Sequence, residues 1–130
     1  MTKTSLLSPL DTGERIAELK LLKHGWLDGK GIAPSHEGLE WFSGVFDQQF
    51  AGDLPPPYLY PTPDGHLRCE WSVNLFELSL EINLKSHLGN WHCLSLHNDA
   101  DVTSTLNLKI ESDWEWLATE LRRLVEAAEY

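Results

Sequence analysis

Hydrophobic and polar positions change their period about halfway along the chain. In the first part the apolar side chains recur every three or four positions, a spacing that predicts amphipathic helices. One such run covers residues 11–23, where Asp11 and Glu14 are spaced as a capping box and Gly25 follows as a C′ residue. A second run begins after Ser35, a typical N-cap residue. We therefore predict two N-terminal helices joined by a glycine-rich loop.

A proline-rich stretch, residues 51–65, separates this helical part from a region in which polar and apolar residues alternate. Proline lacks a backbone N–H and disfavours helix, so we predict an ordered connection that enters an edge strand and turns at Asp64-Gly65. The alternation that follows predicts four strands with one wet face. These strands cover residues 66–73, 76–84, 90–98 and 104–110. Their connections are short, which predicts an antiparallel meander, and Leu106, Leu108 and Ile110 are expected on one side of the last strand.

The chain closes with a third amphipathic segment, residues 112–128. Ser112 and Glu115 have the spacing of a capping box, and four apolar residues form one stripe along this predicted helix. The stripe consists of Trp114, Leu117, Leu121 and Leu124. We therefore predict one α+β domain over residues 1–130. Its parts are two N-terminal helices (1–50), the proline-rich connection (51–65), a four-stranded antiparallel meander sheet (66–110) and a C-terminal helix (112–128) packed on one sheet face.

The charge of the chain narrows the partners that it can bind. Twenty Asp and Glu residues against ten Lys and Arg residues give a formal net charge of −10. Such a chain repels the phosphates of nucleic acid, so we expect no direct nucleic-acid binding. The same charge favours a basic protein partner, with mimicry of DNA as a special case.

The pattern of apolar residues and cysteines indicates a cellular compartment. The sequence has no sustained apolar run of the ~20 residues that a membrane span needs, and its beginning lacks the pattern of a signal peptide. Cys69 and Cys93 are the only cysteines, and without a secretory signal they indicate reduced thiols. We therefore expect a cytoplasmic protein that does not bind membranes.

Residues that are able to bind a metal do not fall into a ligand pattern. The candidates are His66, Cys69, His92, Cys93 and His97. Neighbours among them point to opposite faces of their strands, and none of their spacings matches a zinc site. Both cysteines lie in mid-strand among core-facing side chains, where thiols are unreactive. We therefore expect no metal, no cofactor and no catalytic residue.

Two segments of the chain resemble a family of small uncharacterised bacterial proteins. The segments read LKHGWLDGKGIAPSHEGLEW and PYLYPTPDGHLRCEWSVNLFELSLEINL. The family shares a GW-x-DG-x-G-x-x-P loop, a PTPDGG hairpin followed by EWS, and an ELS-x-EI strand. The resemblance extends from Leu19 to Trp116 and departs at His66, where the family has a second glycine. It implies a bacterial cytoplasmic accessory protein and carries no activity to transfer. The matching positions are Gly25, Trp26, Asp28, Gly29, Gly31, Pro34, Pro61, Pro63, Asp64, Gly65, Glu70 and Trp71.

Most of these motif positions are glycine, proline or a turn acid, which backbone geometry explains. Four others remain, and together with two tyrosines they form the predicted partner-binding set. The set is Trp26, Asp28, Tyr58, Tyr60, Glu70 and Trp71. Two interpretations stay open for Trp26, which either anchors a partner or plugs the gap between the first two helices and the sheet. Trp71 is likewise either a contact residue or a core residue.

These features predict a non-enzymatic, acidic protein-binding or regulatory subunit of a bacterial system, of the antitoxin, immunity or defence-associated type. The prediction depends on the lack of a catalytic set, the acidity and the excess of tryptophan. The alternative is a small hydrolase or other enzyme that uses the carboxylates of Asp28 and Glu70 with His66. Carboxylates that converge in a concave pocket favour the enzyme, and an apolar patch on a flat surface favours the binding protein.

Overall fold

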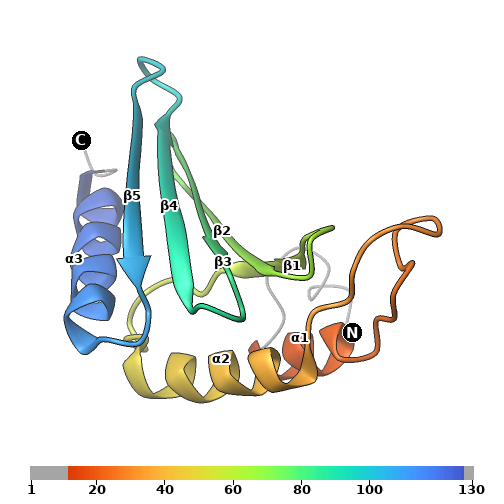
Figure 1. Ribbon diagram of the computed structural model, residues 1–130. Coiled ribbons are helices and arrows are strands. Elements are labelled where there is room, and N and C mark those ends of the chain that lie inside the picture. Colours follow the sequence, from red (N-terminus) through yellow and green to blue (C-terminus); the bar gives the residue numbers. More distant parts are fainter. Residues whose placement is uncertain (1–11, 128–130) are drawn as a thin grey trace, which may run out of the picture.

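The computed structural model of the protein describes residues 12–127, which form three helices and one five-stranded antiparallel sheet (Figure 1). In chain order the elements are α1 (Thr12–Leu19), α2 (His36–Gln49), β1 (Tyr58–Pro61), β2 (Leu67–Val73), β3 (Phe76–Ile82), β4 (Leu88–Ser95), β5 (Asp101–Asn107) and α3 (Glu111–Ala127). The predicted α+β class and the antiparallel pairing are confirmed, whereas the predicted number of strands, four, is too small.

The additional strand is β1, which lies inside the predicted proline-rich connection. It pairs with β2, and the strands then follow one another across the sheet in chain order. The Thr62 amide donates to the His66 carbonyl, and this bond fixes which residues of β1 turn their backbone groups toward β2. Pro61, opposite Leu67, falls at a position whose backbone groups point away from β2. Its missing N–H therefore costs the sheet no hydrogen bond.

β4 and β5 both begin earlier than predicted. β5 starts at Asp101, inside the segment that was expected to link the last two strands, because the Ser95 amide closes a short turn just before it. It ends at Asn107, whose amide donates to the Asp113 carboxylate at 2.6 Å. Leu106 and Leu108 are buried, whereas Ile110 lies beyond the end of the strand and is 45% exposed, so the prediction that it shares their side is wrong.

α1 is shorter than predicted, and α2 begins as predicted. α1 ends at Leu19, so Gly25 is not its C′ residue; its N–H donates across the following loop instead. The predicted capping role of Asp11 lies outside the described residues. Ser35 caps α2, since its hydroxyl oxygen accepts the N–H of Gly38 at 2.9 Å.

α3 begins at Glu111, so Ser112 lies inside the helix and is not its N-cap as predicted. Two hydrogen bonds fasten the start of α3 to the end of β5. The Asp113 carboxylate accepts the last amide of β5, and the Trp114 indole N–H donates to the Leu108 carbonyl at 2.9 Å. The predicted apolar stripe of α3 is buried throughout.

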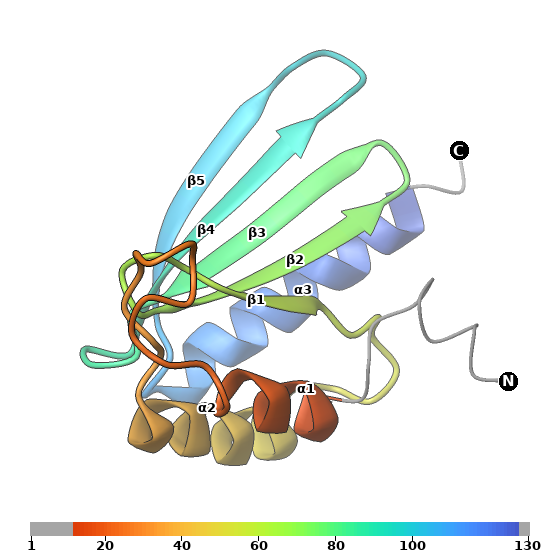
Figure 2. The same cartoon turned by 90° about the vertical axis from the view of Figure 1, so that its right-hand side faces the viewer.

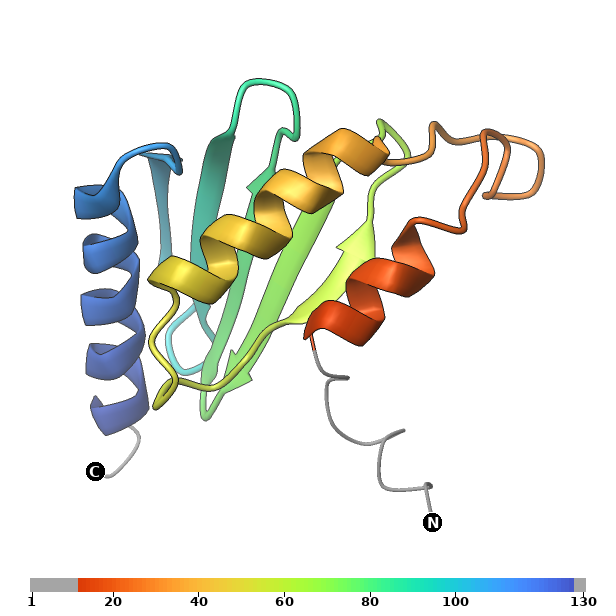
Figure 3. The same ribbon diagram turned by 90° about the horizontal axis from the view of Figure 1, so that it is seen from below.

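All three helices lie on one side of the twisted sheet, and the hydrophobic core fills the space between them (Figures 1 and 3). Strand alternation supplies the sheet side of this core, as predicted for the middle strands. These core residues are Leu67, Cys69, Trp71, Val73, Leu78, Leu80, Ile82, Trp91 and Cys93. Trp71, Trp91 and Trp114 are all buried. Half of the six tryptophans therefore belong to the core, which weakens the argument from tryptophan excess for a binding surface.

Candidate functional site

One face of the sheet is covered by no described helix (Figure 2), and the side chains that it carries from all five strands are mostly polar or aromatic. Strand alternation places them there, because the side chains between them point toward the helices. They are Tyr58, Tyr60, Arg68, Glu70, Ser72, Glu77, Ser79, Glu81, Asn90, His92, Leu94, Asp101, Thr103 and Thr105. We call this set the open face.

Acidic side chains outnumber basic ones on the open face. The acids are Glu70, Glu77, Glu81 and Asp101, and the one Lys or Arg among its residues is Arg68. Arg68 donates to the Glu70 carboxylate at 2.6 Å, and its guanidinium lies 3.5 Å from Glu81. One cation is therefore shared between two acids. The Glu77 carboxylate accepts a hydrogen bond from the Ser72 hydroxyl, and the Asp101 carboxylate lies close to His92 Nε2. No Lys or Arg of the open face neutralises either carboxylate.

Two tyrosines lie beside this acidic cluster at the end of the open face. The strand register places Tyr58 opposite Glu70 and Tyr60 opposite Arg68. Tyr58 is 38% exposed and Tyr60 is 41% exposed, while Leu59 between them is buried. Exposed tyrosine rings next to polar groups are typical of protein interfaces. The structure thus brings together Tyr58, Tyr60 and Glu70 from the predicted partner-binding set.

Trp71 does not belong to the open face. Its side chain is 4% exposed and lies among the rings of Phe50 and Trp91. Its indole N–H donates to the Pro55 carbonyl at 2.9 Å. Its assignment to the partner-binding set is therefore corrected: Trp71 is a core residue, because alternation turns it to the face opposite Glu70.

Asp28 lies in the loop between α1 and α2, and this loop projects away from the sheet (Figure 1). The backbones of Leu27 and Lys30 exchange two hydrogen bonds of 2.7 and 2.9 Å, so Asp28 and Gly29 are the central residues of a tight hairpin. Both have positive φ angles, 51° and 87°. These angles define a type I′ turn, for which Asp-Gly is a favoured pair. Backbone geometry therefore accounts for Asp28.

Trp26 packs against its own loop. Its indole N–H donates to the Ile32 carbonyl at 3.0 Å, and the ring lies so close to Gly31 that a Cβ there would be 3.1 Å from Nε1. The side chain is half-buried and is not among the residues packed against the hydrophobic core. The interpretation of Trp26 as a plug between the helices and the sheet is therefore wrong. Its role as a partner anchor stays a prediction.

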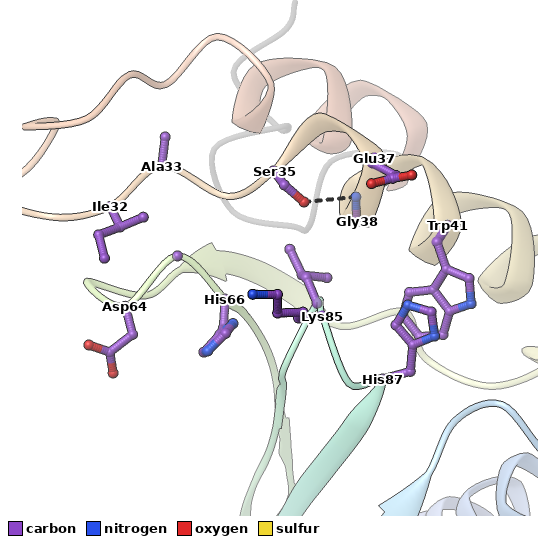
Figure 4. Close-up of a pocket in the computed structure, with 12 residues that line it drawn as sticks. Ile32, Ala33, Ser35, Glu37, Gly38, Trp41, Asp64, His66, Lys85 and His87 are labelled. Atoms are coloured by element: carbon purple, nitrogen blue, oxygen red, sulfur yellow. Dashed lines mark hydrogen bonds between the residues drawn. The ribbon is translucent and has the colours of Figure 1, made fainter.

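A cavity of about 730 Å³ lies where this loop, the start of α2, the β1–β2 turn and the β3–β4 turn meet (Figure 4). Trp41 of α2 stacks on His87 of the β3–β4 turn, with ring centroids 3.7 Å apart and an interplanar angle of 5°. Burial, with a smaller contribution from the charge of Lys109, lowers the pKa of His87 below its ordinary value of 6.5. The neutral imidazole is therefore favoured in this stack.

The cavity does not present a clear chemical preference. Its charged lining groups have both signs, since Lys85 is accompanied by Glu37 and Asp64. Ser35 is the one hydroxyl side chain among the described lining residues, and it already serves as the N-cap of α2. His66 contributes a buried Nδ1 without a hydrogen-bond partner among the described residues. The cavity therefore offers a histidine without an adjoining nucleophile.

The residues of the enzymatic alternative are not gathered by the fold. His66 lines the cavity of Figure 4, Glu70 lines a shallow depression of about 220 Å³ on the open face, and Asp28 is at the tip of the loop hairpin. His66 and Glu70 therefore line different cavities, and Asp28 lines neither of them. The carboxylate of Glu70 is also held by Arg68.

The cysteines and histidines show no reactive or metal-binding arrangement in the described part of the chain. Cys69 and Cys93 are free and buried, and burial raises the pKa of both thiols. No three His, Cys, Asp or Glu side chains among residues 12–127 are close enough together to hold a metal ion.

The sequence analysis did not identify Trp41, Lys85 and His87. Trp41 and His87 are distant in sequence and meet only through the docking of α2 on the β3–β4 turn, so no local spacing signals their stack.

No family model, curated protein or solved structure matches the chain. No helix within the described residues has the length and apolar character to cross a membrane.

Proposed function

We propose that the protein is a non-enzymatic binding protein that presents its open face to a basic surface of another protein. The observation that carries this proposal is the uncovered sheet face, on which two exposed tyrosines lie beside Glu70 and four acids are opposed by one arginine. A cytoplasmic regulatory partner of the antitoxin, immunity or defence-associated type is the setting that the resemblance to small bacterial proteins adds to the proposal.

The acids and the tyrosines have different roles in this proposal. An exposed ion pair contributes only about 0.2–1 kcal/mol, so the four acids act mainly on the association rate and on the choice of a basic partner. Buried aromatic anchors carry much larger shares of binding energy, about 2 kcal/mol or more each. Tyr60 is therefore the proposed affinity anchor, and the Glu70–Glu77–Glu81 cluster is the proposed source of charge selectivity.

The enzymatic alternative has less support. A hydrolase needs its acid and base within reach of one substrate atom, and Asp28, Glu70 and His66 are distributed over a loop tip, the open face and a separate cavity. Glu70 is held by Arg68, two residues earlier on the same face of β2, in an ordinary surface ion pair.

The proposal is tested by affinity capture from bacterial lysate with three baits. The first bait is the wild type. The second carries Glu70→Gln, Glu77→Gln and Glu81→Gln, which neutralise three acids of the open face at almost unchanged size. The third carries Asp47→Asn, Glu115→Gln and Glu126→Gln, which change the net charge equally at exposed helix positions. We expect a basic protein that the first and third baits retain at low salt and the second does not.

A second measurement addresses the tyrosines. Tyr60→Ala is expected to weaken binding of the captured protein by at least about 30-fold, which corresponds to about 2 kcal/mol, without a change in salt dependence. The wild-type complex should weaken as salt is raised. Equal capture by all three baits, or an unaltered affinity of Tyr60→Ala, would show that the open face is not the binding surface.

A further inference from the structure

The two edges of the sheet differ in their ability to accept another strand. An edge strand presents unpaired N–H and C=O groups, and natural proteins usually shield them with proline, charge or a covering element. β1 forms one edge and β5 forms the other.

The β1 edge is blocked. Pro61 offers no N–H at an outward position, and the prolines at positions 55–57 precede the strand. The outward carbonyl of Leu59 already accepts a hydrogen bond from Arg15 Nε of α1 at 2.8 Å. Another strand therefore cannot pair along this edge without displacing α1.

The β5 edge is open. The Ser95 amide donates to the Ala100 carbonyl at one end of β5, and the Leu108 amide donates to the His87 carbonyl at the other end. Between these two bonds, residues of β5 that bond to β4 alternate with residues whose backbone groups point outward. This alternation turns the backbone groups of Asp101, Thr103, Thr105 and Asn107 away from β4. Of these four residues, Asn107 is not available for pairing, because its amide already donates to Asp113.

Three consecutive outward positions therefore remain available. Among the described residues, the amides of Thr103 and Thr105 have no hydrogen-bond partner. The seven residues of β5 contain no proline and only one charged side chain, that of Asp101. β5 thus lacks the protection that β1 has.

A second copy of the chain fits this edge. An antiparallel pair centred on Thr103 sets Thr103 opposite Thr103 of the second copy and Asp101 opposite Thr105. No like charges face each other, and the three outward positions form about six backbone hydrogen bonds. The sequence of the edge is therefore complementary to itself under two-fold symmetry.

The border of the edge on the helix side favours a whole second copy over a lone peptide strand. Val102 is 54% exposed and Trp116 of α3 is 39% exposed, although the Trp116 ring already contacts Trp91 of β4, at a centroid distance of 6.0 Å. A lone strand would leave these apolar side chains in water, whereas the α3 helix of a second copy would cover them.

Local charge also permits this pairing in spite of the net charge of −10. The exposed flank of α3 carries Glu120 and Arg123, which form an ion pair of 2.6 Å. Two-fold symmetry runs the two α3 helices antiparallel, so that Glu120 of each copy can face Arg123 of the other. The charges of Glu120 and Arg123 thus balance on the flank beside β5, whereas the open face carries four acids and one arginine.

We propose that the protein forms a homodimer in which β5 pairs with β5 of a second copy, joining the two sheets into one. The purified chain is tested by sedimentation velocity across the micromolar range. We expect a reversible dimer that strengthens as salt is raised, because salt screens the repulsion between two acidic chains. Binding to a basic partner weakens as salt is raised. The proposed homodimer and the proposed binding function can therefore be refuted independently of each other.

The diagnostic variant is Thr103→Pro, with Thr103→Ala as its matched control. The Thr103 N–H is not used within the chain's own sheet, so proline at this edge position is tolerated by the fold but removes the central pair of dimer bonds. We expect Thr103→Pro to raise the dimer dissociation constant at least tenfold, and Thr103→Ala to change it less. A wild type that stays monomeric at all concentrations, or a folded Thr103→Pro that dimerises as well as wild type, overturns the proposal.

Amide hydrogen exchange of the wild type needs no variant. In the dimer the amides of Thr103 and Thr105 are hydrogen-bonded and should exchange slowly at high protein concentration and quickly on dilution, whereas in a monomer they face water at every concentration. Fast exchange at both concentrations would also overturn the proposal, whatever the stability of the proline variant.

Discussion

Two glycines of α2, Gly38 and Gly44, should respond to the same substitution in opposite directions. Gly38 is buried at the start of the helix, facing the segment that follows β3. A Cβ at this position would lie 2.7 Å from the Cβ of Leu84 and 2.8 Å from the capping Ser35 oxygen. At Gly44 a Cβ would meet no atom within 4 Å.

The magnitudes follow from these distances. Alanine in place of glycine in a helix interior gains about 1 kcal/mol of stability, and Gly44→Ala should gain up to that amount. At Gly38 the new methyl group lies about 1 Å inside normal carbon–carbon contact. Leu84 Cβ is fixed to the backbone and cannot rotate away, so overpacking of about 1–3 kcal/mol is expected, with up to about 1 kcal/mol more if the Ser35 cap is disturbed. These costs sum to as much as about 4 kcal/mol, and the helix propensity of alanine offsets up to about 1 kcal/mol of them, so Gly38→Ala should destabilise the protein by up to about 3 kcal/mol.

Urea unfolding followed by far-ultraviolet circular dichroism measures both changes. We expect the midpoint to fall for Gly38→Ala and to rise for Gly44→Ala, with the same dependence on denaturant as in the wild type. In thermal melts each kcal/mol corresponds to about 4 °C for a chain of this size. If Gly38→Ala is as stable as the wild type, α2 does not pack on Leu84 as described, and the wall of the cavity in Figure 4 is misplaced.

Three further predictions concern Trp26, His87 and the cysteines. Trp26→Ala should cost about 2 kcal/mol, from one lost hydrogen bond and a half-buried ring, against about 3–5 kcal/mol for Trp71→Ala in the core; equal losses in urea melts would contradict the loop position of Trp26. Because burial lowers the pKa of His87, its protonation favours the unfolded state, so the wild type should lose more stability than His87→Asn as pH falls from about 7 to about 5, and parallel pH profiles would refute this. Cys69 and Cys93 should react with a disulfide reagent only after denaturation, since burial raises the pKa of both thiols, and rapid labelling of the native protein would show that one of them is accessible.

The core face of the sheet could be predicted from the sequence because side-chain alternation depends only on strand geometry. Leu67, Cys69, Leu78 and Leu80 are buried as the alternation indicates. The strand ends could not be predicted in the same way. β5 ends at Asn107, not at Ile110, and the bond from its amide to Asp113 of α3 is a tertiary contact that no local pattern contains.

The candidate site was predictable only in part. Glu70 and the two tyrosines share the open face because of strand register, which the proline-rich turn indicated. The turn position of Asp28 has a signal in the sequence, since Asp-Gly between two short extended segments is typical of a type I′ turn. The Trp41–His87 stack joins segments that are distant in sequence and needs the folded structure to be recognised.

The order of the strands has a consequence for synthesis of the chain on the ribosome. Every strand pairs with its neighbour in sequence, so the sheet can assemble by successive hairpins as β2 to β5 emerge. The apolar stripe of α2, which includes Leu39, Phe42 and Phe46, is synthesised first but packs against that sheet. Because the chain is synthesised at about 5–20 residues per second, this stripe stays exposed for several seconds until the strands that cover it have been made. The first half of the nascent chain is therefore the part that most needs a chaperone.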